Sequence, residues 1–216
     1  MNTEELKDII SEGESSTVEF KRKISSLQKI SKEISAFANT KGGLIIIGVD
    51  DDGTIVGVSS EKEEIDQIIT ACNFHIIPPV EPSFDIISLK KKDILIVYIN
   101  ESDNKPHKII EENPDTKKPI KRAYIRVGES SVIASREMTR LLAAQNANSK
   151  PLTISFGDKE KRLFAYLEKN EKTTVKEFAK IVNISSRRAE RLLISLVRAG
   201  VLQIHSDTNH DYFTLV

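Results

Sequence analysis

Apolar and polar residues along the first two thirds of the chain follow two periods, one typical of helices and one typical of strands. Apolar residues three and four positions apart predict helices, at residues 4–11, 27–38, 61–73 and 135–145. Alternation, or a short β-branched run, predicts strands, at residues 17–21, 44–49, 54–58, 84–89, 94–99, 107–110 and 122–127. This order indicates an α+β domain with a mixed sheet and helices packed against it.

The last part of the chain has a simpler pattern of helices followed by strands. Helical periods cover residues 159–169, 174–182 and 186–199, and two short strands follow at residues 201–204 and 212–216. Three helices followed by a hairpin is the order of a winged helix-turn-helix. The segment resembles the winged-helix families of transcription regulators, which implies a small DNA-binding domain.

A boundary between the two parts is predicted at residues 145–151, which are small and polar and end in a proline. Linkers between domains often have this composition. We therefore expect an N-terminal domain over residues 1–146, a linker over 147–154 and a C-terminal domain over 155–216.

Charge and composition narrow the classes of function. The 216 residues carry 32 basic and 32 acidic side chains, so a wholly basic nucleic-acid-binding chain is excluded. Residues 151–216 nevertheless hold 11 basic against 8 acidic side chains. No apolar run approaches the roughly 20 residues of a membrane span, and the acidic N-terminus lacks the apolar core of a signal peptide. With Cys72 as the only cysteine, we expect a cytoplasmic protein without membrane contact, in which this thiol lies in the core.

Basic side chains stand at the start of the predicted helix 186–199. Arg187, Arg188 and Arg191 lie off its apolar stripe, and Ser185 and Ser186 precede or begin it. A recognition helix presents its N-terminal residues to the major groove, and arginine suits bidentate contact with guanine. The serines and the helix N-terminus are suited to phosphate. The alternative is a solvated basic face in an interaction or dimerisation module.

Four motifs in the N-terminal part carry a family resemblance. They read ESSTVEFK at residues 14–21, SAFANTKGG at 35–43, IIGVDDDGTIVG at 46–57 and YIRVGESS at 124–131. Together they resemble the Schlafen-type AlbA domain, a family of DNA-binding domains. In bacteria such a domain is frequently followed by a winged helix, in proteins described as transcriptional regulators, and the arrangement here is similar.

The resemblance also implies an acidic site. Eukaryotic Schlafen proteins include nucleases that act on structured RNA, and their catalytic carboxylates match Glu14, Glu19 and either Asp50 or Asp51 here. Three converging carboxylates, which we place at Glu14, Glu19 and Asp51, would hold Mg²⁺ or Mn²⁺ and activate water for phosphodiester cleavage.

A structural interpretation of the same acids stays open. Glu19 is equally suited to pair with Lys21 or Arg126 on a solvated face, and the aspartates after residue 49 are typical of a hairpin turn. The basic side chains of this domain are candidates for phosphate contacts, at Lys21, Arg22, Lys23 and Arg126.

The sequence therefore favours a DNA-binding transcriptional regulator, with DNA as the first partner and RNA as the second. The alternative hypothesis is a metal-dependent nuclease targeted by its winged helix. A homodimer is expected, and for the nuclease it would restore the clamp that eukaryotic Schlafen enzymes form from two such lobes, since this chain has one.

Overall fold

The computed structural model describes residues 1–146, 157–206 and 211–216. The chain divides into two compact units, Met1–Ile133 and Ala134–Val216. Within the described residues, no helix is long and apolar enough to cross a membrane.

The first unit is built on a mixed four-stranded sheet. Its strands follow the order β1 (Val18–Lys21), β2 (Gly43–Ile47), β5 (Lys92–Ile99) and β4 (Ser83–Leu89). The β1–β2 pair is parallel, and the other two pairs are antiparallel. The predicted mixed-sheet α+β domain is thereby confirmed, as is the hairpin formed by β4 and β5.

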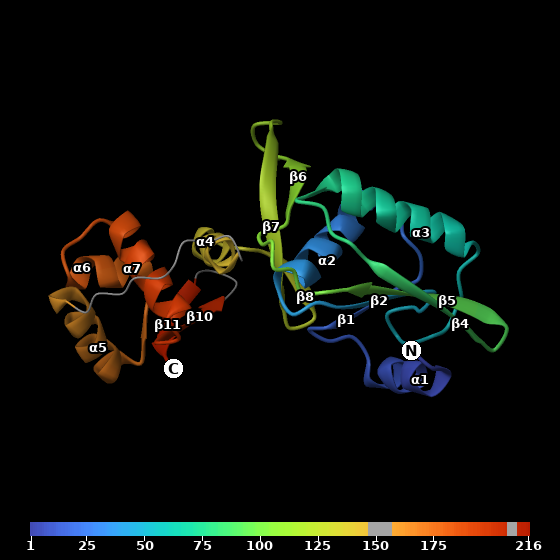
Figure 1. Ribbon diagram of the computed structural model, residues 1–216, viewed down its shortest axis with the longest axis horizontal. Coiled ribbons are helices and arrows are strands. Elements are labelled where there is room, and N and C mark those ends of the chain that lie inside the picture. Colours follow the sequence, from blue (N-terminus) through green and yellow to red (C-terminus); the bar gives the residue numbers. More distant parts are fainter. Residues whose placement is uncertain (147–156, 207–210) are drawn as a thin grey trace. The chain divides into compact units, whose positions relative to one another are not determined.

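Both faces of this sheet are covered. Figure 1 shows α1 on one side and α2 and α3 on the other, with bounds Thr3–Glu12, Leu27–Asn39 and Glu61–Thr70. Phe20 and Ile46 pack with Leu6 of α1, whereas the alternate residues Ile45 and Ile47 pack with Phe37 of α2. Successive side chains in a strand point to opposite faces, so the β-branched run of β2 serves two hydrophobic cores.

A second, antiparallel sheet packs against α2 and brings distant motifs together. Its order is β3 (Ile76–Ile77), β6 (Lys108–Glu112), β7 (Pro119–Val127) and β8 (Ser130–Ile133). A single π-helical turn, Ala71–His75, connects α3 to β3. The sequence predicts neither β3 nor β8, because two- and four-residue edge strands carry little periodic signal.

The prediction of a strand at residues 54–58 is wrong, because the structure has a loop there. The chain leaves β2 at Gly48, whose φ of +102° suits glycine, and only the bridge Val49–Ile55 remains of the expected hairpin. Gly48 and Gly57 approach so closely that an added Cβ at Gly48 would lie 3.1 Å from the Gly57 backbone. Residues 50–57 therefore form a tight loop, and the acidic run after β2 lies in it.

The described residues of the second unit form four helices and a small sheet. The helices are α4 (Arg136–Gln145), α5 (Asp158–Asn170), α6 (Val175–Ile181) and α7 (Ser186–Arg198). The strands β9 (Lys172–Thr173), β10 (Leu202–Ser206) and β11 (Asp211–Leu215) form an antiparallel sheet in the order β10–β11–β9. The short strand β9 is absent from the sequence prediction. Leu163, Phe178, Leu193 and Phe213 form the centre of this unit's core.

The helix α4 belongs to the second unit, which differs from the domain boundaries that the sequence predicts. Leu141 of α4 is buried in the core of the second unit, with Met138 and Ala144 packed against it. The division consequently falls before α4, not at residue 146. An amphipathic pattern shows that a helix has an apolar face but not which core that face joins. The predicted linker, 147–154, lies outside the described residues.

Candidate nucleic-acid interface

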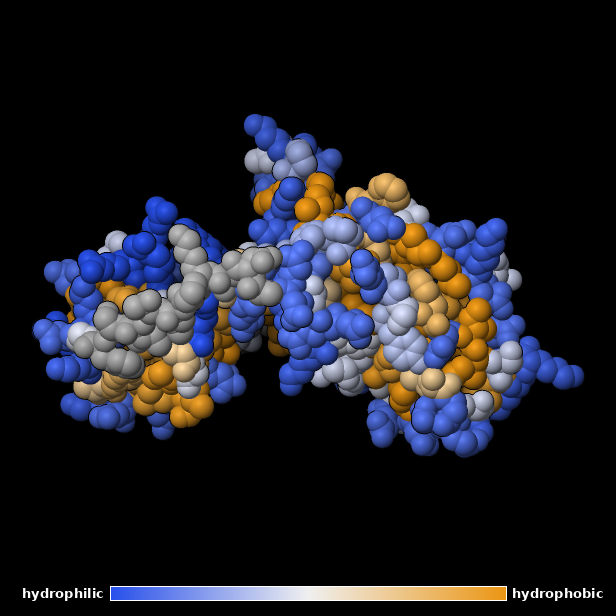
Figure 2. Space-filling model, viewed as in Figure 1, coloured by the Kyte–Doolittle hydropathy of each residue, from blue (hydrophilic) through white to orange (hydrophobic). Residues whose placement is uncertain are grey.

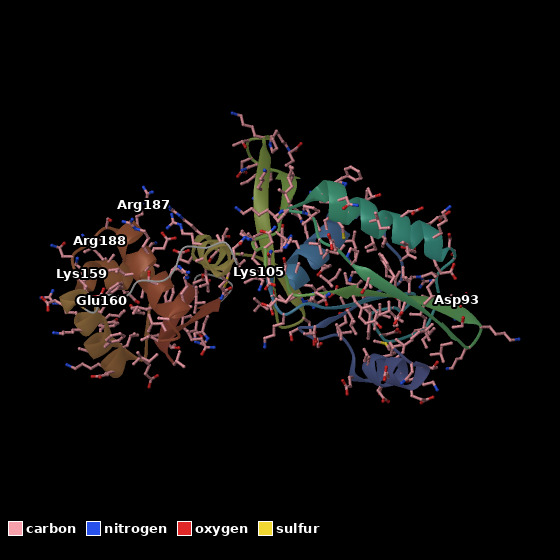
Figure 3. The ribbon with its side chains drawn as sticks, in the orientation of Figure 1. Asp93, Lys105, Lys159, Glu160, Arg187 and Arg188 are labelled. Carbon is pink, nitrogen blue, oxygen red and sulfur yellow. The ribbon has the colours of Figure 1, made fainter. Side chains whose placement is uncertain are left out.

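The start of α7 is an exposed basic surface. Its apolar residues Ala189, Leu193 and Leu196 are buried, while the predicted contact residues are exposed, at Ser185, Ser186, Arg187, Arg188 and Arg191. Figure 3 shows Arg187 and Arg188 at the outer rim of their unit, directed away from its body. In Figure 2 the surface over this region is mostly hydrophilic.

Local sequence explains where both α6 and α7 start. Thr174 caps α6 by accepting a hydrogen bond from the Glu177 backbone N–H at 3.3 Å, and the Glu177 carboxylate accepts one from the Thr174 backbone N–H at 2.8 Å. After α6 the chain turns through Asn183, with φ of +52°, and Ser185 takes the extended N-cap position of α7. The Ser185 hydroxyl makes no capping hydrogen bond within the described structure. It is therefore available to a phosphate oxygen, as are the first amides of α7.

The carboxylates predicted in the N-terminal unit are near one another but hold different partners. Glu14 Oε1 accepts a hydrogen bond from the backbone N–H of Phe20 at 2.8 Å, so the glutamate lies in the turn before β1. Burial raises the pKa of Glu14, the Phe20 hydrogen bond opposes the shift, and the charges of Glu19 and Asp51 add to it.

Both carboxylate oxygens of Glu19 accept hydrogen bonds from cationic side chains. Its Oε1 accepts from Lys21 Nζ, and its Oε2 accepts from Arg126 Nη1 at 2.8 Å. The side chains of Glu19 and Arg126 are only 9% and 1% exposed. The pairing of Glu19 with Lys21 and Arg126, one of the alternatives from the sequence, is what the structure contains, although the pair is buried and not solvated.

Arg126 ties several elements together. Besides Glu19, Nη1 donates to Glu33 of α2 at 3.0 Å, and Nη2 donates to the Ser15 carbonyl at 2.7 Å. The guanidinium lies 4.7 Å from the ring centroid of Phe37, at cation–π distance. This burial contradicts the predicted contact between Arg126 and nucleic acid, because a side chain enclosed by protein cannot reach a phosphate.

The remaining predicted residues lie nearer the surface. Arg22 is exposed and donates to Asp50 Oδ2 at 3.0 Å. Lys23 and Asp51 are also exposed, whereas Lys21 is partly buried by its pairing with Glu19. Arg22 and Lys23 are thus the two predicted basic residues of this unit that are open to a ligand.

The acidic residues do not fit a Mg²⁺ or Mn²⁺ site. Across residues 1–146, 157–206 and 211–216, no three His, Cys, Asp or Glu side chains are grouped closely enough to hold a metal ion. Both oxygens of Glu19 already accept from cations, and one oxygen of Glu14 accepts from the backbone.

Two further polar residues, which are not among the predicted site residues, hold the motifs in place. Asn39 is buried, and its Nδ2 donates to the carbonyls of His107 and Tyr124 at 2.8 and 2.9 Å, while its Oδ1 accepts from the His107 N–H at 2.7 Å. Glu33 accepts from Ser131 of β8 as well as from Arg126. Glu33 stands four positions before Phe37 on α2, and that spacing was the signal that it faces the same side.

A comparison with known families agrees with the fold of the first unit. The model of the family described as Schlafen, AlbA_2 matches residues 14–135. The chain therefore belongs to the Schlafen AlbA_2 family. Membership implies nucleic-acid binding.

Two solved structures are similar to the chain. The DIP2311 protein from Corynebacterium diphtheriae has 21% identity and a TM-score of 0.44 over 71% of this chain and 35% of its own. The N-terminal domain of a RecG-related protein from Nitrosomonas europaea has 26% identity and a TM-score of 0.42 over 58% of this chain and 88% of its own. The chain thus spans about a third of the length of DIP2311.

Proposed function

We propose that the protein is a DNA-binding transcriptional regulator whose second unit is a winged helix-turn-helix. In this proposal α6 and α7 form the helix-turn-helix, and α7 enters the major groove. The hairpin β10–β11 is the wing, although residues 207–210 at its tip lie outside the described residues.

The observation that carries the proposal is the separation of faces on α7. Most apolar side chains of the helix are buried, while three arginines in its first two turns are exposed together with Ser185 and Ser186. A solvated helix face usually mixes both signs of charge. The only acid on α7, Glu190, is 3% exposed, so the open side of the first turns is purely basic.

Duplex binding tests the proposal directly. We expect Arg187→Ala combined with Arg188→Ala to weaken binding by about tenfold or more, because one good base contact or a few phosphate contacts have that magnitude. Fluorescence anisotropy with a labelled DNA duplex, in buffer containing a chelator, measures the affinity without cleavage. Lys161→Ala combined with Arg162→Ala on α5, where both basic residues are also exposed, is the matched control for loss of two charges.

Sequence selection tests the regulator role. Wild-type protein incubated with a random-sequence DNA library is expected to enrich one motif, and the Arg187/Arg188 variant is expected to enrich none. Binding of equal strength to every sequence would contradict a regulator. Unchanged duplex affinity in the variant would remove α7 as the recognition helix.

The first unit is proposed to add a second nucleic-acid surface at Arg22 and Lys23, which are exposed beside the turn at Asp50. Dimerisation also stays a prediction. A two-fold dimer would read two half-sites one helical turn apart, and light scattering of the full chain measures the oligomeric state.

A further inference from the structure

Within the second unit, α4 lies alongside α7 and is joined to it by a buried acid. Glu190 of α7 contacts Arg140 Nη1 through Oε2 and Arg136 Nε through Oε1, the latter at 3.9 Å. The carboxylate is buried, whereas the Arg136 side chain is 68% exposed and that of Arg140 is 33% exposed. Glu190 thus holds Arg140 against α7 and lies within ion-pair distance of Arg136, whose side chain is largely open to solvent.

These arginines extend the basic surface of α7. Partial burial lowers the pKa of Arg140, the positive charges of Arg136, Arg187 and Arg191 lower it further, and the charge of Glu137 opposes them. Arg136 of α4 and Arg187 and Arg191 of α7 are therefore close enough to Arg140 to repel it. Such a concentration of like charge is unfavourable in the free protein, and a polyanion relieves it.

The charge pattern of α5 differs. Lys159 and Glu160, labelled in Figure 3, are neighbours in its first turn, and acids and bases alternate along the helix. All five basic residues of α4 and of the first two turns of α7 are arginines: Arg136, Arg140, Arg187, Arg188 and Arg191. The planar guanidinium is suited to bidentate contact with phosphate oxygens.

We propose that α4 is a second DNA-contacting element, in which Arg136 and Arg140 bind phosphates of the same duplex that α7 enters. The inference rests on the proposed function of α7. Glu190 acts as a positioning residue, since its carboxylate holds Arg140 against α7 and does not itself face the DNA. The contacts position the protein on the backbone and carry no sequence information.

The salt dependence of binding tests this inference. Each phosphate contact contributes about 0.9 to the slope of log K against log salt. We expect Arg136→Gln to reduce the slope by about 1 on a DNA duplex of mixed sequence. Arg162→Gln, which removes one exposed charge from α5, is expected to leave the slope unchanged.

A second variant avoids leaving Glu190 buried without a partner. Arg140→Gln combined with Glu190→Gln keeps both the net charge and a hydrogen-bonding pair, so a slope reduced by about 1 reports loss of a direct contact rather than loss of overall charge. Far-UV circular dichroism checks that both variants fold. If the double variant loses its helical signal, Arg136→Gln decides the question alone, because its side chain is largely exposed.

Two negative results are distinguishable. If wild-type protein fails to bind duplex DNA, the proposed function and this inference both fall. If wild type binds and the Arg187/Arg188 variant weakens binding, while Arg136→Gln and the double variant keep the wild-type slope, α4 is not a DNA-contacting element and the proposed function stands.

Discussion

The buried pair of Glu19 and Arg126 gives a test that separates a structural role for Glu19 from a catalytic one. Glu19→Gln keeps the shape of the side chain and removes its charge. Breaking a buried ion pair at one partner costs about 3–5 kcal/mol. Because Arg126 retains Glu33 at 3.0 Å, we expect the lower end, about 3 kcal/mol.

Hydrogen exchange followed by mass spectrometry along a urea series measures this loss unit by unit. Peptides from β7 and α2 should open at a urea concentration lower by about 1–3 M, given typical urea slopes of about 1–3 kcal/mol per M. Peptides from α7 provide the internal control, since they belong to the other unit.

Two companion variants sharpen the result. Asp50→Asn breaks the exposed pair with Arg22, and its cost is expected to stay below about 1 kcal/mol. Glu19→Gln combined with Arg126→Met should cost less than the sum of the two single variants, because the two side chains act as one interaction. The structural reasoning is refuted if Glu19→Gln unfolds at the wild-type urea concentration yet abolishes a metal-dependent cleavage of RNA.

Two more predictions follow from perturbed groups. The raised pKa of Glu14 means that folding disfavours its ionised form, so this residue lowers the stability of the fold as the pH rises toward its folded pKa. Glu14→Gln should therefore be more stable than wild type at pH 7 and lose that advantage under acid conditions, where Glu14 is protonated. Urea titrations at both pH values measure the difference, and a variant that is less stable than wild type at pH 7 would contradict this reasoning. Burial raises the pKa of Cys72 to about 12, so its thiol should react with a disulfide reagent only after denaturation, and rapid reaction of native protein would show that the core opens there.

Much of the fold follows from local patterns in the sequence. The run at residues 44–49 predicts a strand buried on both faces, and β2 packs into two cores through Ile46 on one face and Ile45 and Ile47 on the other. A strand of this kind depends on residues that are close together in the sequence, and hydrophobic periodicity detects it well.

The partners of the buried charges depend on contacts that local patterns do not encode. Glu19 and Arg126 are 107 positions apart, and no spacing rule connects them. The alternation of side chains along β7 nevertheless predicts that Arg126 points inward. Tyr124 and Arg126 share one face of β7, and Tyr124 lies in the core beside α2, so placing the tyrosine inward places the arginine inward as well.

The position of α4 determines how the chain can be divided for separate study. A C-terminal fragment that began after residue 146 would lack Leu141, which fills part of its core, and Arg140, which neutralises Glu190. Such a fragment would have a cavity in its core and a buried glutamate without its cationic partner. If it failed to bind DNA, the failure would report misfolding and not the loss of recognition. A fragment that starts at Ala134 keeps the helix with the unit to which it belongs.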